Sequence, residues 1–155
     1  SDTAEMRRIW ARYHDLISVW DLDVQAVLGR LEQAGLAENT IVFLLSDHGL
    51  GLPRYKRWLY KTGLQVPLIV HVPEKFRHLA PGGAAQGRHA SPVSLIDLPP
   101  TVLSLAGIEA PATYAGRALF GAKATAPSGP ALIFGARDRA DDMYDLSRSV
   151  YDGRY

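Results

Sequence analysis

The sequence contains the run Ile41-Val42-Phe43-Leu44-Leu45, which continues directly as Ser46-Asp47-His48-Gly49. An apolar run without alternation predicts a strand that is buried on both faces, as in a parallel sheet covered by helices. The polar residues then follow at the carboxyl end of the strand, which is the edge where ligands bind in open α/β sheets. This segment therefore predicts an α/β fold with a functional site directly after residue 45.

A long amphipathic helix is expected before this strand. Asp2 or Thr3 is placed to cap its start, Gly35 is placed to end it, and the turn Glu38-Asn39-Thr40 leads into the strand. Apolar residues at spacings of three and four give it a length of about 30 residues. The apolar stripe consists of Ile9, Tyr13, Leu16, Ile17, Trp20, Val24, Val27, Leu28 and Leu31.

Short elements and loops are expected after the site. The apolar run Val66–Val72 predicts a second strand, and residues 73–89 predict an excursion on the surface. A short helix should open at Asp97 as N-cap, carry two prolines in its first turn and stop at Gly107. A third strand is a candidate at residues 131–135, and residues 147–155 are a candidate for half of a hairpin cut off after Asp152-Gly153. This order of elements predicts an α/β sandwich.

Composition narrows the classes of function. The chain has 155 residues, of which 47% are hydrophobic and 21% charged, an ordinary globular composition that excludes wholesale disorder. A formal net charge of +1 predicts neither a nucleic-acid partner nor an anionic membrane surface. No apolar stretch approaches the roughly 20 residues of a membrane span, and the polar start Ser1–Glu5 is not a signal peptide. Cysteine is absent, which excludes disulfides, thiolate catalysis and cysteine-based zinc sites in this chain.

Asp47 and His48 are the first candidates for a site. An adjacent carboxylate and imidazole can ligate one divalent ion if the backbone bends there, which Gly49 permits. In the alternative interpretation Asp47 caps a following helix and His48 is an ordinary loop histidine, and position alone leaves both open. A hard cation such as calcium takes about six or more oxygen ligands, so this pair needs donors from elsewhere.

A cationic and aromatic segment follows at Leu52–Lys61. Arg54, Lys56, Arg57 and Lys61 could neutralise the charge that develops on an anionic substrate near a metal ion. The residues by themselves favour a solvated basic loop whose aromatic side chains pack on the sheet.

The remaining candidates are weaker. The charge run at residues 137–142 is typical of a solvated face. Ser128-Gly129-Pro130 begins like a Ser-x-Pro-x-Arg nucleophile motif, but Leu132 stands where arginine is required. The other histidines have no ligand spacing: His14, His71, His78 and His89.

Together, these segments resemble the sulfatase family of the alkaline-phosphatase-like superfamily. The similarity is closest to bacterial sulfatases with Met-Pro-Arg-x-Lys-Arg-Trp after an Asp-His-Gly turn, which Leu52–Trp58 matches apart from its first residue. Residues 134–139 and 148–150 resemble the start of the C-terminal subdomain. The other matching motifs, in order, are Leu31-x-x-x-Gly35-Leu36-x-x-Asn39-Thr40-Ile41-Val42, Ser46-Asp47-His48-Gly49, Lys56-x-x-Leu59-Tyr60, Val66-Pro67-Leu68-Ile69-Val70, and Asp97-Leu98-x-Pro100-Thr101 with Leu105-Ala106-Gly107.

The resemblance implies roles for the candidate residues. Asp47 and His48 resemble the second pair of calcium ligands, and Lys56 resembles the lysine that contacts the sulfate ester. Arg54, Arg57 and Lys61 become candidates for substrate binding. Lys61 stands where the family usually has an acidic residue, and Gln65 stands where arginine is frequent, so both departures could alter substrate preference.

The resemblance also implies how the chain is organised. The formylglycine nucleophile, made from Cys or Ser, the first aspartate pair and a further histidine lie upstream in the family, and none is in this sequence. The chain is therefore expected to be an internal or C-terminal fragment that is inactive alone. Residues 1–125 would be the C-terminal portion of the catalytic domain, with a mostly parallel central sheet flanked by helices. Residues 126–155 would begin a truncated C-terminal subdomain.

The implied activity of the parent enzyme is calcium-dependent hydrolysis of a sulfate ester, either of a small molecule or of an oligosaccharide, with a sulfated carbohydrate favoured. Family resemblance implies a periplasmic or secreted location and leaves the oligomeric state open. A first alternative is a phosphatase, phosphodiesterase or phosphotransferase of the same superfamily, which usually uses zinc or manganese and a Ser or Thr nucleophile. A second alternative is a non-catalytic remnant or binding module with weak calcium affinity and marginal stability.

Overall fold

The computed structural model describes residues 2–83, 87–124 and 132–154. The chain divides into two units, residues 1–40 and residues 41–155. Within the described residues, none of the helices has the length and apolarity that crossing a bilayer requires.

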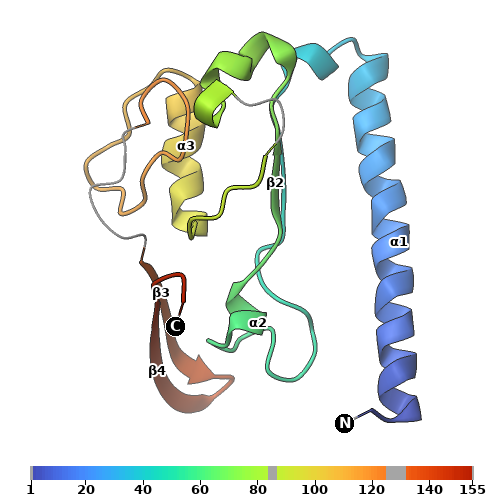
Figure 1. The fold of residues 1–155 in the computed structure, drawn as a ribbon. Coiled ribbons are helices and arrows are strands. Elements are labelled where there is room, and N and C mark those ends of the chain that lie inside the picture. The colour runs from blue at the N-terminus through green and yellow to red at the C-terminus, as the bar shows by residue number, and fades with distance from the viewer. Residues whose placement is uncertain (1, 84–86, 125–131, 155) are drawn as a thin grey trace. The chain divides into compact units, whose positions relative to one another are not determined.

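The first unit is dominated by one long helix, α1 (Ala4–Gln33), drawn in blue in Figure 1. The Thr3 hydroxyl accepts a hydrogen bond from the Met6 amide at 3.2 Å, which caps the first turn. Gly35 adopts a left-handed conformation with φ of +69° just after the helix ends. The predicted helix, its cap and its stop are therefore confirmed, and a 3-10 helix, Ala37–Asn39, follows it.

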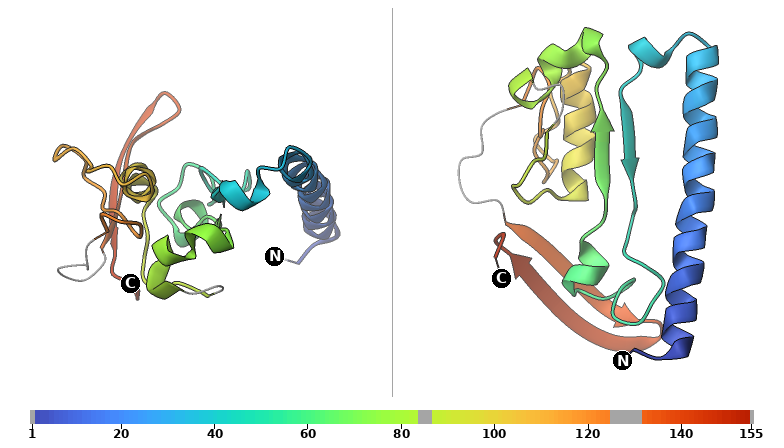
Figure 2. Two further views of the ribbon diagram at one scale, coloured as in Figure 1. Left: turned by 90° about the horizontal axis from the view of Figure 1, so that it is seen from above. Right: turned by 45° about the vertical axis from the view of Figure 1, so that its right-hand side comes forward.

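The second unit begins with a pair of strands, β1 (Val42–Leu45) and β2 (Leu68–His71). The strands pair antiparallel, with Leu45 opposite Leu68, and they lie side by side in Figure 2. All four residues of β1 are half-buried, so the prediction of a strand buried on both faces differs from the structure. An apolar run predicts apolar surroundings but says nothing about the direction of the neighbouring strand.

The sheets formed by the described residues are small. Each contains two strands, and both pairs are antiparallel. The expected mixture of helices and strands is confirmed at this coarse level. The mostly parallel central sheet is not formed among the described residues and stays a prediction.

Short helices occupy the segments between the strands. They are α2 (Lys61–Leu64), α3 (Leu98–Leu105) and the 3-10 helices Glu74–Leu79, Pro81–Gly83 and Leu95–Asp97. Gly107, with φ of +74°, ends α3 as predicted.

Asp97 stands at the predicted N-cap position of α3, but its carboxylate makes no capping bond there. It accepts instead from the Ser94 amide at 3.0 Å, closing a capping box on the preceding 3-10 helix, and from the Arg117 amide at 2.9 Å. Ser94 lies three residues earlier and competes for the same carboxylate.

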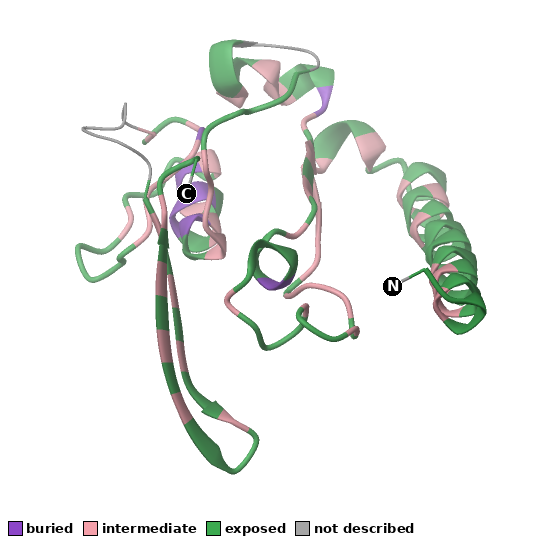
Figure 3. Ribbon diagram, turned by 60° about the horizontal axis from the view of Figure 1, so that its bottom comes forward, coloured by how far each residue is buried: buried purple, intermediate pink, exposed green. Residues whose placement is uncertain are grey.

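The buried centre of this unit lies around α3 and combines Pro100 and Phe120 with small polar groups (Figure 3). Thr101 is 0% exposed; its hydroxyl donates to the Asp97 carbonyl at 2.6 Å and accepts from the Leu119 amide at 2.9 Å. The Ser104 hydroxyl accepts from the Lys123 amide at 2.9 Å. These bonds fasten the segment after residue 116 to the helix.

The chain then forms a hairpin from β3 (Ile133–Ala140) and β4 (Met143–Tyr151). The turn lies at Asp141-Asp142, where Asp141 has φ of +54°. Residues 147–151 lie in one strand of a hairpin, as predicted, but their partner is the preceding strand β3. A further hairpin turn at Asp152-Gly153 stays a prediction. The charged residues Arg137, Asp138 and Arg139 conceal the second half of the strand in the sequence, because Arg137 occupies a half-buried position while Asp138 and Arg139 are exposed.

Three sequence predictions fall on residues 125–131, which lie outside the described residues. They are the first residue of the third strand candidate, the boundary between residues 125 and 126, and the rejected motif Ser128-Gly129-Pro130. The boundary stays a prediction.

Replacing Thr101 by valine should lower the free energy of unfolding by about 1–3 kcal/mol, because the Leu119 amide and the Asp97 carbonyl lose a buried partner. Urea unfolding measures the change. Val102→Ala is the matched control, since Val102 is 52% exposed and should change stability by less than about 0.5 kcal/mol. Equal losses in the two variants would contradict the assigned role of the hydroxyl.

Candidate functional site

The segment after β1 bends back on itself within three residues. The Ser46 amide donates to the Pro67 carbonyl at 3.4 Å, which adds one backbone hydrogen bond between the two chain segments just beyond the paired residues Leu45 and Leu68. The Ser46 hydroxyl donates to the His48 carbonyl at 2.8 Å and closes the turn. Asp47 and His48 are therefore displayed at the end of the strand, as the sequence predicted.

Two glycines hold this turn against α2. The Gly49 amide donates to the Gly63 carbonyl at 3.2 Å. A Cβ at Gly49 would lie 2.2 Å from the Thr62 carbonyl oxygen, and a Cβ at Gly63 would lie 2.1 Å from the Trp58 carbonyl oxygen. Gly49 is thus required for close backbone approach, not for the bend that the sequence interpretation assigned to it.

Asp47 and His48 present two donors next to each other. The His48 Nδ1 lies 2.8 Å from the Gly49 carbonyl oxygen, an arrangement that places the ring proton on Nδ1. The Nε2 atom is not used by this contact and lies 3.5 Å from the Asp47 Oδ1. Both side chains reach solvent, with 84% of Asp47 and 41% of His48 exposed.

This geometry fits two neighbouring ligands of one cation. Histidines that bind metals commonly donate the other ring N–H to a carbonyl, as His48 does to Gly49. Within residues 2–83, 87–124 and 132–154, no group of three or more His, Cys, Asp or Glu side chains gathers to hold a metal ion. A cation at this pair would need further ligands.

Backbone hydrogen bonds order the cationic segment that follows. The Lys56 amide donates to the Leu50 carbonyl at 2.8 Å, and the Trp58 amide donates to the Tyr55 carbonyl at 3.0 Å. On either side of Lys56, Arg54 and Arg57 have φ of +69° and +72°. Left-handed non-glycine residues cost roughly 1–2 kcal/mol each, so the surrounding contacts must stabilise this backbone.

The four cations of the segment have different surroundings. The Arg57 guanidinium pairs with Asp141 in the hairpin turn. Among the described residues, the side chains of Arg54, Lys56 and Lys61 form no ion pair. Lys56 therefore presents an ammonium without an ion-pair partner in the part of the chain that the structure describes, while Arg57 is already engaged.

Arg137 of β3 reaches the same segment. Its guanidinium lies 4.3 Å from the centre of the Trp58 ring, and one of its nitrogens donates to the Arg57 carbonyl at 3.1 Å. Asp145 of β4 pairs with its other terminal nitrogen and accepts from the Ser147 hydroxyl at 3.0 Å. Only 10% of the Arg137 side chain is exposed. The guanidinium thus joins the segment to the hairpin.

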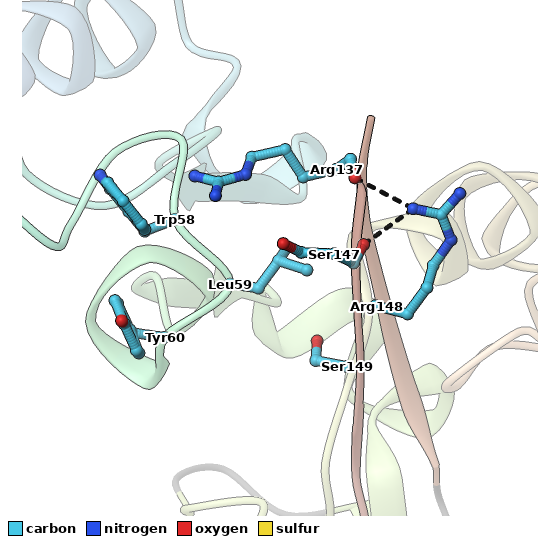
Figure 4. Close-up of a pocket in the computed structure, with 7 residues that line it drawn as sticks. All are labelled: Trp58, Leu59, Tyr60, Arg137, Ser147, Arg148 and Ser149. Carbon is cyan, nitrogen blue, oxygen red and sulfur yellow. Dashed lines mark hydrogen bonds between the residues drawn. The ribbon is translucent and has the colours of Figure 1, made fainter. Parts of the chain in front are cut away.

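A pocket of about 210 Å³ lies between the segment and the hairpin. Figure 4 shows Trp58 and Tyr60 on one side and the serines of β4 on the other, with Arg137 reaching toward Trp58. The two aromatic rings stack with centres 5.7 Å apart and an angle of 16° between their planes. The residues that line the pocket are Trp58, Leu59, Tyr60, Arg137, Ser147, Arg148 and Ser149.

Sequence interpretation missed Arg137, Asp145 and the serines of β4. The sequence pattern assigns Arg137 to a solvated charge run. Arg137 nevertheless follows Ile133 and Gly135 at two-residue spacing on one face of β3, and this spacing was a usable signal of its half-buried position. Nothing in the sequence indicated that Asp145 would pair with it.

Gly63→Ala should displace the segment, because the added Cβ meets the Trp58 and Tyr55 carbonyl oxygens at 2.1 and 2.3 Å. Limited trypsin digestion should then cut after Arg54, Lys56 or Arg57 several times faster than in the wild type. Gly51→Ala is the matched control, since a Cβ there has no heavy atom within 4 Å. Equal digestion rates for the two variants would contradict the assigned role of Gly63.

Acid should weaken the junction between the segment and the hairpin. The hydrogen bond from Arg137, followed by that from Ser147, lowers the pKa of Asp145 below its usual range. A lowered folded pKa means that the stabilisation is complete above the unfolded value of about 3.9 and is lost as the pH falls through the folded value. The unfolding free energies of wild type and Asp145→Asn should therefore converge below about pH 3.9. A difference that stayed constant down to about pH 2 would contradict this linkage.

Comparison with known proteins places these features in a family. A family model described as Sulfatase matches residues 1–108. The chain is 38% identical over 150 residues to an ulvan-active sulfatase of Formosa agariphila, covering 96% of this chain and 23% of that protein. It is 34% identical over 119 residues to arylsulfatase K of Bos taurus, covering 74% of this chain and 21% of that protein. It is 34% identical over 122 residues to steryl-sulfatase of Mus musculus, covering 68% of this chain and 18% of that protein.

The chain thus spans about a quarter or less of the length of these relatives. The family match extends over most of the chain and includes β1, the pair Asp47 and His48, and Lys56. On this evidence the chain belongs to the sulfatase family.

Proposed function

We propose that this chain supplies part of the catalytic domain of an enzyme that hydrolyses a sulfate ester with the help of a divalent metal ion. The observation that carries the proposal is the orientation of Asp47 and His48, whose carboxylate and Nε2 lie together at the end of β1. Membership of the sulfatase family supports the same reaction class. The nucleophile, expected to be a formylglycine, would come from sequence outside these 155 residues.

Each residue of the site has a proposed task. Asp47 and His48 would hold the metal ion, and such an ion, when bound, would withdraw charge from the ester oxygens. Lys56 would donate a hydrogen bond and a positive charge to the oxygens of the sulfate group, including the one that leaves. Arg54 and Lys61 would bind other anionic groups of the substrate, and Arg57 would contribute mainly through its backbone, because its side chain pairs with Asp141.

The identity of the metal ion is part of the proposal. Calcium follows from the family resemblance, and the exposed carboxylate of Asp47 suits it. The imidazole of His48 is a softer donor and is more usual for zinc than for calcium. Restoring activity to the metal-free enzyme with calcium, manganese or zinc separately would identify the ion.

A sulfated carbohydrate is the proposed class of substrate. The relative that covers 96% of this chain is named an ulvan-active sulfatase, which makes ulvan the first substrate to test. The stacked pair Trp58 and Tyr60 supports a ring-shaped substrate, since both aromatic side chains remain exposed beside the cationic segment. We further propose a periplasmic or secreted location.

The 155-residue chain by itself is expected to be inactive and to bind calcium weakly. Within the part that the structure describes, Asp47 and His48 are joined by no third His, Cys, Asp or Glu ligand, whereas calcium takes about six or more donors. Binding of calcium by the isolated chain below micromolar concentration would contradict this expectation.

Lys56→Ala in the full-length protein should lower kcat on an aryl sulfate by about 100-fold or more, because a donor to the reacting oxygens is lost. A chelator should abolish activity as well. Lys75→Ala is the control, since this lysine stands on the 3-10 helix Glu74–Leu79 outside the site, and it should leave the rate unchanged.

Two outcomes would contradict the proposal. Sulfate ester hydrolysis that is indifferent to both Lys56→Ala and the chelator would remove these residues from the mechanism. A clear preference for an aryl phosphate over an aryl sulfate would favour the alternative of a metal-dependent phosphatase or phosphodiesterase.

A further inference from the structure

We infer that Arg137 is a positioning residue for Lys56, and that the β3–β4 hairpin holds the cationic segment in its working conformation. This inference rests on the function proposed above, in which Lys56 contacts the sulfate ester. Arg137 touches neither Lys56 nor the metal pair; it acts through the two residues that follow Lys56.

Lys56 is held by the backbone on both sides. Its own amide donates to the Leu50 carbonyl at 2.8 Å, which ties it to the turn that carries His48. The next residue, Arg57, offers its carbonyl oxygen to Arg137 at 3.1 Å. Trp58 then lies under the same guanidinium at 4.3 Å. One side chain from β3 therefore fixes the two residues after Lys56.

The geometry requires arginine and not just a positive charge. The planar guanidinium stacks on Trp58, donates to the Arg57 carbonyl and pairs with Asp145 at the same time. Asp145 is itself oriented by the Ser147 hydroxyl at 3.0 Å. A lysine ammonium can pair with Asp145, but it cannot make all three contacts at once.

Burial supports a fixed position for this side chain. Arg137 is 10% exposed, and its Nε is buried without a hydrogen-bond partner in the described part of the chain. Such a buried donor is unfavourable and is rare in native proteins. Its presence indicates that the contacts with Trp58, Arg57 and Asp145 outweigh the hydration of the guanidinium.

The ion pair of Arg57 with Asp141 is a second, weaker link between segment and hairpin. Its side chains are 62% and 76% exposed, and pairs with such exposure contribute little because water screens them. Arg137 is therefore the main link, and Asp141 is the auxiliary one.

A positioning role matters because catalysis is sensitive to small displacements. A reacting group that moves by about 1 Å can cost about 100-fold in rate. Loss of Arg137 should free the Arg57 carbonyl and the Trp58 ring and let the left-handed backbone at Arg57 relax. The ammonium of Lys56 would then sample positions away from the ester.

The test compares Arg137→Ala, Arg137→Lys and Arg139→Ala in the full-length protein. Arg137→Ala should lower kcat on an aryl sulfate by about 10- to 100-fold, while KM changes less than about threefold. The kcat of Arg137→Lys should be closer to that of the alanine variant than to that of the wild type. Arg139→Ala should match the wild type, because Arg139 lies on the same strand over the Tyr144 ring and has no contact with the segment among the described residues.

Hydrogen exchange gives a second readout that needs no turnover. In Arg137→Ala, the amides of Lys56 and Trp58 should exchange faster, while those of β1 and β2 keep their wild-type rates. Faster exchange throughout the second unit would make Arg137 a general stabilising residue and would overturn the inference. Unchanged kcat together with unchanged exchange in the segment would overturn it too.

Asp141→Asn keeps the inference testable if Arg137→Ala does not fold. Asparagine tolerates the left-handed conformation at this turn, so the variant removes the pairing charge and preserves the backbone. It should raise exchange at the Lys56 and Trp58 amides above the wild-type rates while those of β1 and β2 stay unchanged, and a wild-type profile in every segment amide would count against the hairpin's role. If the wild-type enzyme fails to hydrolyse sulfate esters while segment exchange responds to Arg137, the proposed function fails and the hairpin contact stands.

Discussion

The backbone contact between Gly49 and Gly63 is the constraint on which the candidate site depends. It brings the first residues after β1 to α2, so that the chain between them must close into a compact loop. That loop carries Lys56 and the left-handed residues Arg54 and Arg57. No side chain larger than hydrogen fits at either glycine, and the site's shape is therefore set by the absence of two Cβ atoms.

The loop closed by this contact is bordered by the turn after β1 on one side and by the β3–β4 hairpin on the other. Toward the strand, the turn displays Asp47 and frees the Nε2 of His48, because Nδ1 is engaged by the Gly49 carbonyl. Toward the hairpin, Arg137 and Asp145 hold the segment after Lys56. A carboxylate with a neighbouring imidazole, and an ammonium without an ion-pair partner in the described chain, are thus held by one loop; our proposal assigns the first two to a metal ion and the third to the sulfate ester.

Much of the local structure could be predicted from the sequence. The stripe of α1, its Thr3 cap and its Gly35 stop follow from local periodicity and local backbone preference, which need no knowledge of the rest of the chain. The same holds for β1 and for Gly107 after α3. Asp47 and His48 were placed at the strand end because a polar pair directly follows an apolar run.

The errors involve contacts that local sequence patterns do not reveal. Asp97 was expected to cap α3, but Ser94 and Arg117 compete for its carboxylate. The direction of β2 against β1 depends on the whole path through α2, and the partner of Arg137 lies eight residues away across a turn made of two aspartates. The pattern of charges along a sequence indicates an exposed face, but it does not reveal which charged side chains form ion pairs in the folded chain.

The most direct measurement is a diffraction experiment on the full-length protein with a metal ion whose anomalous signal locates it. The account predicts a peak bonded to the Asp47 carboxylate and to the Nε2 of His48, with Nδ1 still donating to the Gly49 carbonyl. A metal ion bound elsewhere, with Asp47 and His48 left in solvent, would contradict the assignment of this strand end as a metal centre.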